Sequence, residues 1–202
     1  MADVEYLRNL LGVHPNFPKK GWGLPSSICS PSYGSVAFET LITHLVHHIT
    51  SQTIPRTESK KIDTVVGLDA RGFLLGPIVA LRLGAAFVPV RKKGKLPGKC
   101  TTVTYEKEYG ADSFDMQEGA IPAGSNVVII DDLIATGKSS YLYSFHPTDI
   151  VGDAGGSAKA AGELVAKQGG KTVEYIFVVG LPFLKGHEKL DAPAYSIIQA
   201  ED

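Results

Sequence analysis

Three apolar segments of this chain each run directly into a charged or glycine-containing loop, and this repeated pattern constrains the fold more than any other feature. The loops begin at Asp69-Ala70-Arg71-Gly72, at Arg91-Lys92-Lys93-Gly94-Lys95 and at Asp131-Asp132, and the last continues through Leu-Ile to Ala135-Thr136-Gly137. Short apolar runs bounded by such loops predict buried strands. Because parallel strands bring their carboxyl ends to one edge of a sheet, we expect the three loops to surround one crevice.

Segments with helical periodicity separate these strands. Residues 36–50 (VAFETLITHLVHHIT) carry apolar side chains at helical spacing, and GPIVALRLG predicts a helix that ends at Gly84. A third helix is expected over SAKAAGELVAKQGG, with Ser157 as N-cap and Gly169 as C-cap, and late strands are expected at TVEYIFVVGL and APAYSIIQA. This alternation predicts one α/β domain over residues 1–202 with a mainly parallel sheet.

His44 and His48 lie four residues apart on the first predicted helix, a spacing that also suits a metal pair. The neighbouring sequence offers them no carboxylate or cysteine partner. We therefore interpret both histidines as part of a solvated helix face.

The composition excludes several functional classes. With a net charge of -1 over 202 residues, the chain has no overall basic field for nucleic acid or an anionic membrane. No apolar run reaches the ~18 residues that a membrane span needs, and the N-terminal residues lack the basic and apolar regions of a signal peptide. Cys29 and Cys100 lie far apart without metal-type spacing, so we expect unpaired thiols in a reducing cytoplasm.

The third loop has the features of a phosphate cradle. The small residues Ala135-Thr136-Gly137 let backbone N–H groups approach an anion, and a following helix would add its positive N-terminal end. Gly137-Lys138-Ser139 resembles the end of a Walker loop, but position 132 is not glycine, which excludes that motif.

The charged residues around the crevice suit a phosphorylated sugar. The Asp131-Asp132 pair would repel a phosphate but could hold ribose hydroxyls, or Mg²⁺ that bridges ligand oxygens. Arg71, Arg91 and Lys95 together indicate a polyphosphate site. A capped, solvated strand end for the acids and ordinary surface charge for the basic residues are the alternatives.

At these residues the chain resembles a known family. The stretch VVIIDDLIATG resembles the phosphoribosyl pyrophosphate motif of type I phosphoribosyltransferases, and GLDARGFLLGP, VRKKGKLPG, YEKEYG and LPFLKGHEKL narrow the resemblance to adenine phosphoribosyltransferases. It covers most of residues 62–137 and 156–202, together with HPNFPKKG and the helix that follows. The resemblance implies a Rossmann-like parallel sheet flanked by helices, with a small hood over the crevice.

The resemblance also implies the reaction. Adenine and 5-phosphoribosyl 1-pyrophosphate would give AMP and pyrophosphate in purine salvage, with Mg²⁺ as cofactor, in a cytoplasmic homodimer. Glu108 would be the catalytic residue that handles the purine proton, with Tyr109 beside it in a mobile lid. The implied ligand-binding residues are Asp69, Ala70, Arg71, Arg91 and Lys95 for the pyrophosphate, Asp131 and Asp132 for the ribose or its Mg²⁺, and Ala135, Thr136, Gly137, Gly156 and Ser157 for the 5-phosphate.

Two segments depart from the family pattern. Residues 138–155 separate the phosphate turn from its helix, and their removal restores DDLIATGGSAKAAGELV. We hypothesise a retained intron here, and a regulatory loop is the alternative. Residues 22–35 are rich in Ser and Pro where the family has an apolar segment beside the adenine, so we suspect a frame error there and assign no base-binding residue. A catalytically impaired nucleotide-binding protein and a phosphoribosyltransferase for another purine therefore remain as alternative functions.

Overall fold

The computed structural model describes residues 2–10, 13–15, 23–25, 34–107, 110–134, 154–180 and 186–199. Its helices are α1 (Ala2–Leu10), α2 (Ser35–His48), a π-helix (Ile49–Thr53), two 3₁₀-helices (Ile54–Arg56 and Gly186–Lys189), α3 (Gly72–Leu83) and α4 (Ala154–Lys167). Its strands are β1 (Val13–Pro15), β2 (Gly23–Pro25), β3 (Thr64–Leu68), β4 (Ala86–Lys92), β5 (Cys100–Lys107), β6 (Gly110–Gln117), β7 (Asn126–Ile134), β8 (Lys171–Gly180) and β9 (Ala194–Gln199).

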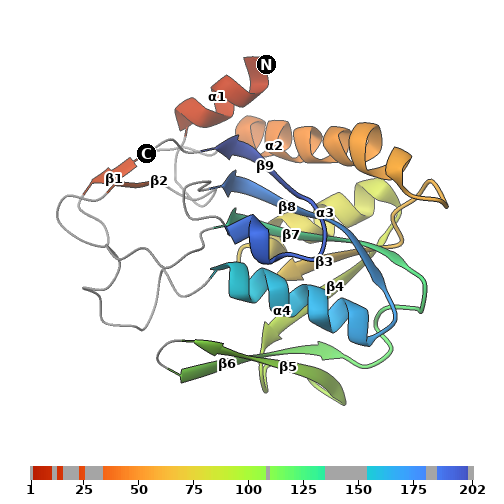
Figure 1. The fold of residues 1–202 in the computed structure, drawn as a ribbon. Coiled ribbons are helices and arrows are strands. Elements are labelled where there is room, and N and C mark those ends of the chain that lie inside the picture. The colour runs from red at the N-terminus through yellow and green to blue at the C-terminus, as the bar shows by residue number, and fades with distance from the viewer. Residues whose placement is uncertain are drawn as a thin grey trace.

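Seven of these strands form one sheet in the order β5-β6-β4-β3-β7-β8-β9 (Figure 1). The five strands from β4 to β9 are parallel, and β6 and β5 extend the sheet as an antiparallel hairpin beside β4. The expected mainly parallel α/β fold is therefore confirmed. The antiparallel β1–β2 ribbon stands apart from the sheet, on the side toward which β7, β8 and β9 point, where a hood is expected.

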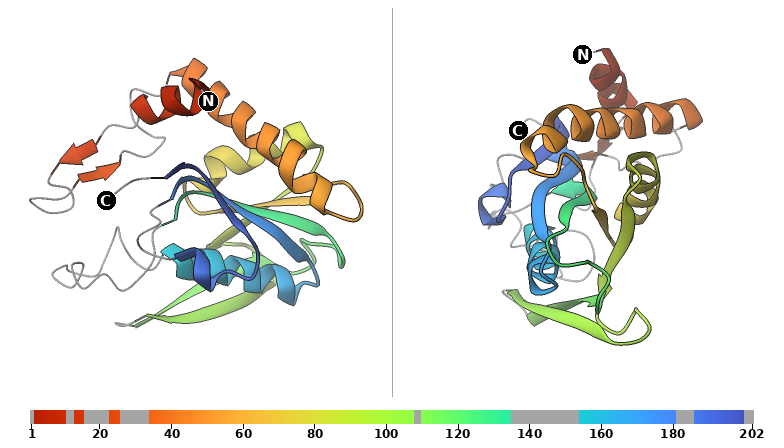
Figure 2. Two further views of the ribbon diagram at one scale, coloured as in Figure 1. Left: turned by 45° about the horizontal axis from the view of Figure 1, so that its top comes forward. Right: turned by 90° about the vertical axis from the view of Figure 1, so that its right-hand side faces the viewer.

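Helices cover both faces of the sheet (Figure 2). α2 and α3 pack on one face, where alternate residues such as Val65, Val128 and Ile176 form the core, and α4 packs on the other face over residues such as Ile129 and Phe177. Successive side chains of a strand point to opposite faces, so central strands buried on both sides must be apolar throughout. The uninterrupted apolar runs of β3 and β7 have this cause. None of the helices in the described part of the chain is long and apolar enough to cross a membrane.

The helix ends agree with the sequence in two of three cases. α3 is followed by Gly84 as its C-cap and α4 by Gly169, both as predicted. Ser157, however, is not an N-cap, because α4 begins at Ala154. Gly155 and Gly156 have low helix propensity, so the sequence did not indicate that the helix begins before Ser157. Both glycines are buried. Tertiary packing therefore sets the first turn.

The interpretation of the two histidines is wrong. His48 Nε2 donates to Glu174 Oε2 at 3.0 Å, and its ring stacks on Tyr195 with the ring centroids 3.5 Å apart. His44 Nε2 lies 3.0 Å from the Tyr195 hydroxyl oxygen. The partners come from β8 and β9, so local sequence could not reveal them. No group of three or more His, Cys, Asp or Glu side chains suited to a metal occurs within the described ranges.

Buried Glu174 is the centre of this polar cluster. It is 3% exposed, and it accepts further hydrogen bonds from Thr53 Oγ1 at 2.5 Å and Arg56 Nη2 at 2.7 Å. Burial alone would raise the pKa of Glu174, but the hydrogen bonds from His48, Thr53 and Arg56 together outweigh burial and hold it below its usual value. The cluster therefore fastens α2 and the π-helix to the sheet.

Candidate active site

The strand order reverses beside β3, which is where the predicted crevice should lie. The chain passes from β3 through α3 to β4 on one side of β3, whereas β7 pairs on its other side. In open α/β sheets, ligands bind at this switch point, beyond the carboxyl ends of the strands. The segment Asp69-Ala70-Arg71 follows β3 directly, with a cis peptide bond between Asp69 and Ala70. It therefore lies at the expected place.

The acid pair does not end its strand, contrary to the sequence interpretation. β7 pairs with β3 only as far as Gly67 and Ile130, but it continues along β8 until Ile134 pairs with Gly180. Because β8 is longer than β3, Asp131 and Asp132 are still strand residues where β3 has already turned away. Both acids are thus held in extended backbone at the crevice edge.

Gly72 brings the start of α3 against this strand. A Cβ atom at Gly72 would lie 2.7 Å from the carbonyl oxygen of Ile130, closer than side-chain carbons approach backbone oxygens. Only glycine allows α3 to begin this close to β7. Arg71, the N-cap of α3, is thereby placed beside the acid pair.

Arg71 forms an ion pair with the second acid. Its Nε lies 2.6 Å from Oδ2 of Asp132, which is 3% exposed. The Oδ1 atom of Asp132 is buried and has no hydrogen-bond partner among the residues that the structure describes. Asp131 instead accepts the backbone N–H of Asp132 at its own Oδ1, at 2.9 Å. One buried carboxylate oxygen of the crevice is therefore available to a donor from a ligand.

Burial dominates the electrostatics of the two acids. It raises the pKa of Asp131 well above the usual value, and the negative charge of Asp132 raises it further. Burial also raises the pKa of Asp132, although the Arg71 guanidinium opposes this effect. Two adjacent carboxylates, one buried and one partly buried, favour ligands that bring hydroxyl donors or positive charge.

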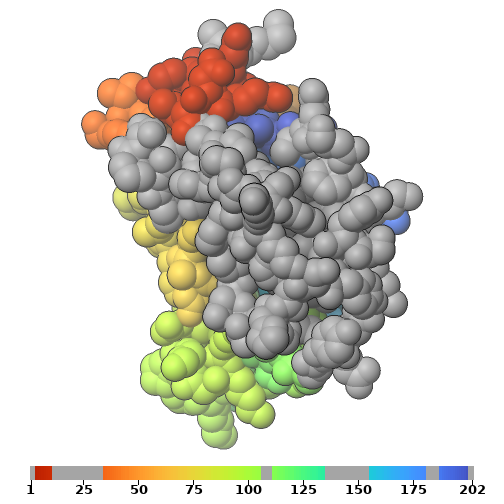
Figure 3. All heavy atoms as spheres, turned by 90° about the vertical axis from the view of Figure 1, so that its left-hand side faces the viewer, coloured from red at the N-terminus to blue at the C-terminus, as the bar shows by residue number. Residues whose placement is uncertain are grey.

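The end of β4, which includes Arg91, and the basic turn after it meet the loop after β3. Arg91 Nε donates to Asp69 Oδ2 at 2.8 Å, its Nη1 donates to the carbonyl oxygen of Lys95 at 3.1 Å, and its guanidinium lies 5.9 Å from the Phe73 ring centroid. In Figure 3, which faces the strand ends, the yellow start of α3 lies next to the yellow-green segment that contains this loop. The structure thus brings together all three predicted loops as far as it describes them.

The remaining predicted residues divide into two groups. Gly156 and Ser157 lie in the first turn of α4, and Ser157 Oγ is 3.4 Å from the Tyr105 hydroxyl oxygen. The others lie outside the described residues: Glu108, Tyr109, Ala135, Thr136 and Gly137. Sequence reasoning also missed Asp115, a buried acid between Phe114 and Met116 on β6. A lone acid between apolar strand residues was the available signal.

Comparison with known proteins identifies the family. Residues 36–139 match the family model described as a phosphoribosyl transferase domain. Adenine phosphoribosyltransferase 1 of Saccharomyces cerevisiae is 45% identical, with 98% of this chain and 94% of that protein covered. The adenine phosphoribosyltransferase of Yarrowia lipolytica is 43% identical over 97% of this chain and 95% of that protein.

Solved structures agree with the sequence relatives. The S. cerevisiae adenine phosphoribosyltransferase complexed with an imino-altritol bisphosphate and adenine has a TM-score of 0.79 and 44% identity, covering 98% of this chain and 99% of that one. The enzyme of Thermoanaerobacter pseudethanolicus has a TM-score of 0.77 and 35% identity, covering 98% and 99%. These likenesses span the whole chain, at identities that establish common descent. This chain therefore belongs to the adenine phosphoribosyltransferase family of enzymes.

Proposed function

We propose that this protein transfers the 5-phosphoribosyl group of 5-phosphoribosyl 1-pyrophosphate to N9 of adenine, which forms AMP and releases pyrophosphate in purine salvage. The proposal rests on two ion pairs at the switch point of the sheet, Arg71 with Asp132 and Arg91 with Asp69. These two ion pairs place two cations and three carboxylates, including Asp131, around one crevice. A sugar that carries a pyrophosphate needs both kinds of group.

The basic residues suit the pyrophosphate. Arg71 and Arg91 are partly exposed, and each forms an ion pair with an acid at the switch point of the sheet. Guanidinium groups bind phosphate oxygens in a bidentate manner, so an incoming pyrophosphate can replace these carboxylates. Lys95 and the peptide units of residues 69–71 would complete this part of the site.

The acid pair suits the ribose. The buried Oδ1 atom of Asp132 has no hydrogen-bond partner among the residues that the structure describes, so it can accept a hydrogen bond from a ribose hydroxyl. Departure of pyrophosphate leaves positive charge on the sugar ring, as in an oxocarbenium ion. Carboxylates fixed beside the ring before the reaction stabilise that charge without rearrangement.

The 5-phosphate and the base complete the reaction. The phosphate would bind to backbone N–H groups of Ala135–Gly137 and to the first turn of α4, with Ser157 as a hydroxyl donor. Glu108 would hold the proton that leaves the purine, and a lid containing Glu108 and Tyr109 would exclude water from the activated sugar.

Magnesium fits this donor set. Mg²⁺ prefers carboxylate and phosphate oxygens and usually keeps several non-protein ligands. Asp131 and Asp132 offer carboxylate oxygens, while the described residues hold no larger cluster of metal-ligating side chains, so the pyrophosphate and ribose oxygens would supply most of the coordination. When bound, Mg²⁺ would offset the negative charge of the leaving pyrophosphate.

We also propose that the protein works as a cytoplasmic homodimer. Leu74 and Leu81 on α3 are 47% and 80% exposed, an apolar surface that a second copy could cover. Light scattering during size-exclusion chromatography tests this; a monomer at micromolar concentration would contradict it.

Turnover of the purified protein tests the main proposal. Formation of the corresponding nucleoside 5′-monophosphate should be followed by chromatography with adenine, hypoxanthine, guanine or xanthine as the base. We expect adenine to be converted and the other bases to react at least tenfold more slowly. Preference for another base would contradict the adenine assignment, and no turnover with any base would contradict enzymatic activity.

The segment 138–155 provides the matched comparison for an impaired enzyme. Its deletion joins Gly137 to Gly156 and restores the uninterrupted sequence DDLIATGGSAKAAGELV, although it also removes Ala154 and Gly155 from the start of α4. If the segment is a retained intron, the deletion should raise turnover and the mature transcript should lack these codons. Equal turnover with and without the segment favours a regulatory loop, and resequencing residues 22–35 tests the suspected frame error.

A further inference from the structure

We propose that Asp115, on β6, is a positioning residue that holds the basic turn Lys92–Lys95 in the shape needed for pyrophosphate binding. The inference rests on the proposed function, because it concerns the substrate end of the same site. Neither carboxylate oxygen of Asp115 bonds to the acid pair; they bond to Gly94 and Thr102. Its effect would pass through the backbone of the turn to Lys95 and Arg91.

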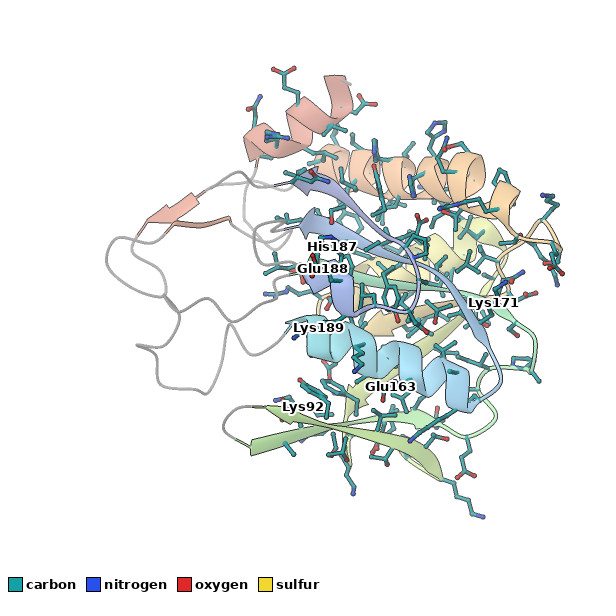
Figure 4. The ribbon with its side chains drawn as sticks, viewed as in Figure 1. Lys92, Glu163, Lys171, His187, Glu188 and Lys189 are labelled. Carbon is teal, nitrogen blue, oxygen red and sulfur yellow. The ribbon has the colours of Figure 1, made fainter. Side chains whose placement is uncertain are left out.

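The turn has a defined geometry. The N–H of Lys95 donates to the carbonyl oxygen of Lys92 at 3.2 Å, which closes a four-residue turn. Gly94, its third residue, has φ +79°, as a type II turn requires. Figure 4 labels Lys92, where β4 ends and this turn begins, whereas Lys171 marks the opposite end of the sheet. The turn therefore lies at the crevice edge.

The side chain of Asp115 binds the backbone of this turn. Its side chain is buried, its Oδ2 accepts the N–H of Gly94 at 2.8 Å, and its Oδ1 accepts the hydroxyl of Thr102 at 2.7 Å. On β6 it stands opposite Arg91 of β4 and Thr102 of β5. Both carboxylate oxygens are thus occupied, one by the turn and one by the neighbouring strand that keeps the carboxylate oriented.

A short series of contacts links Asp115 to the site. From the anchored Gly94 the chain passes to Lys95, whose carbonyl oxygen accepts Arg91 Nη1 at 3.1 Å. The same arginine reaches Asp69 at 2.8 Å. Loss of the anchor would let the turn move, so that Lys95 and Arg91 would lose their fixed positions.

The charge of Asp115 matches this task. The segment Arg91–Lys95 carries four cationic side chains within five residues, and these repel one another. A buried carboxylate hydrogen-bonded to the middle of the turn offsets part of this repulsion before any ligand arrives. Pyrophosphate can then bind to a preformed cationic turn rather than ordering it.

Steady-state kinetics of Asp115→Ala test the proposal. We expect KM for 5-phosphoribosyl 1-pyrophosphate to rise about tenfold, which corresponds to about 1.4 kcal/mol, while KM for adenine and kcat stay within about twofold. Ser113→Ala is the matched control on the same strand, because its exposed Oγ bonds Thr104 Oγ1 of the neighbouring strand, at 2.8 Å, and not the basic turn. The control should leave all three constants within about twofold of the wild-type values.

Two further variants separate positioning from general stability. Asp115→Asn keeps an acceptor for Gly94 but lacks the charge, so its KM should lie between those of the wild type and the alanine variant. Gly94→Ala strains the turn at φ +79° without touching Asp115, and it should reproduce the selective rise in KM. If Asp115→Ala does not fold, these two variants carry the test.

Calorimetric binding of inorganic pyrophosphate distinguishes this inference from the proposed function. A wild type that makes AMP and binds pyrophosphate, with variants that bind about tenfold more weakly, supports both. If the wild type is active but the variants bind pyrophosphate normally, the inference is overturned and the function stands. The same holds if the variants lose kcat and adenine affinity as much as they lose pyrophosphate affinity. A wild type that neither makes AMP nor binds pyrophosphate overturns both.

Discussion

Replacement of Glu174 by alanine should destabilise the protein strongly although the residue lies away from the crevice. The substitution removes the acceptor of three side chains: His48, Thr53 and Arg56. Thr53 is fully buried and cannot turn to water, whereas the Arg56 side chain is 46% exposed and can. Breaking a fully buried ion pair costs about 3–5 kcal/mol of folding free energy. Because water can solvate the partly exposed Arg56 guanidinium in the variant, we expect a loss near the lower end, at about 3 kcal/mol.

Urea and thermal unfolding followed by circular dichroism measure this loss. For a domain of this size 1 kcal/mol corresponds to about 2–4 °C in Tm, so the melting temperature should fall by about 6–12 °C at pH 7. The surface variant Glu39→Ala, which loses a bidentate but exposed pair with Arg82, is the control and should hardly change Tm. A loss below about 1 kcal/mol for Glu174→Ala would refute the idea that this cluster fastens α2 to the sheet.

The pH dependence gives a second check on the same variant. The folded-state pKa of Glu174 is lowered, so its stabilising contribution is present above the unfolded value of 4.5 and is lost as the pH falls through the lower folded value. The stability gap between the wild type and Glu174→Ala should therefore be constant near neutrality and narrow below about pH 4.5. A gap that widens with acid would contradict this sign.

Two further variants test the crevice itself. Asp131→Asn should raise Tm at pH 7 while lowering turnover, because the raised pKa of Asp131 means that its ionised form destabilises the fold. This gain should shrink as the pH falls through the raised folded pKa and vanish below 3.8, where the acid is protonated in both states; an unchanged Tm at pH 7 would contradict it. Gly72→Ala should cost about 1–3 kcal/mol in urea unfolding and raise KM for 5-phosphoribosyl 1-pyrophosphate, because the new Cβ would meet the Ile130 carbonyl oxygen at 2.7 Å; normal values for both would show that α3 can shift freely.

The sequence by itself determined the features that depend on neighbours along the chain. Apolar runs specified β3 and β7, helical spacing specified α2, and Gly84 and Gly169 marked helix ends. The parallel arrangement then followed from alternation, and with it the gathering of the charged loops at one edge. These are local signals, because periodicity and turn chemistry act over a few residues.

Tertiary structure decided the features whose partners are distant in sequence. It extended β7 past Asp131 because β8 is longer than β3, and it began α4 before Ser157 because buried glycines pack there. It supplied His48 with a carboxylate 126 residues away and placed Asp115 under a turn on another strand. The physical reason is that each feature depends on a partner distant in sequence: the longer strand β8 for β7, and the groups packed against a buried polar or small residue in the other three cases. A local sequence pattern does not identify such a partner.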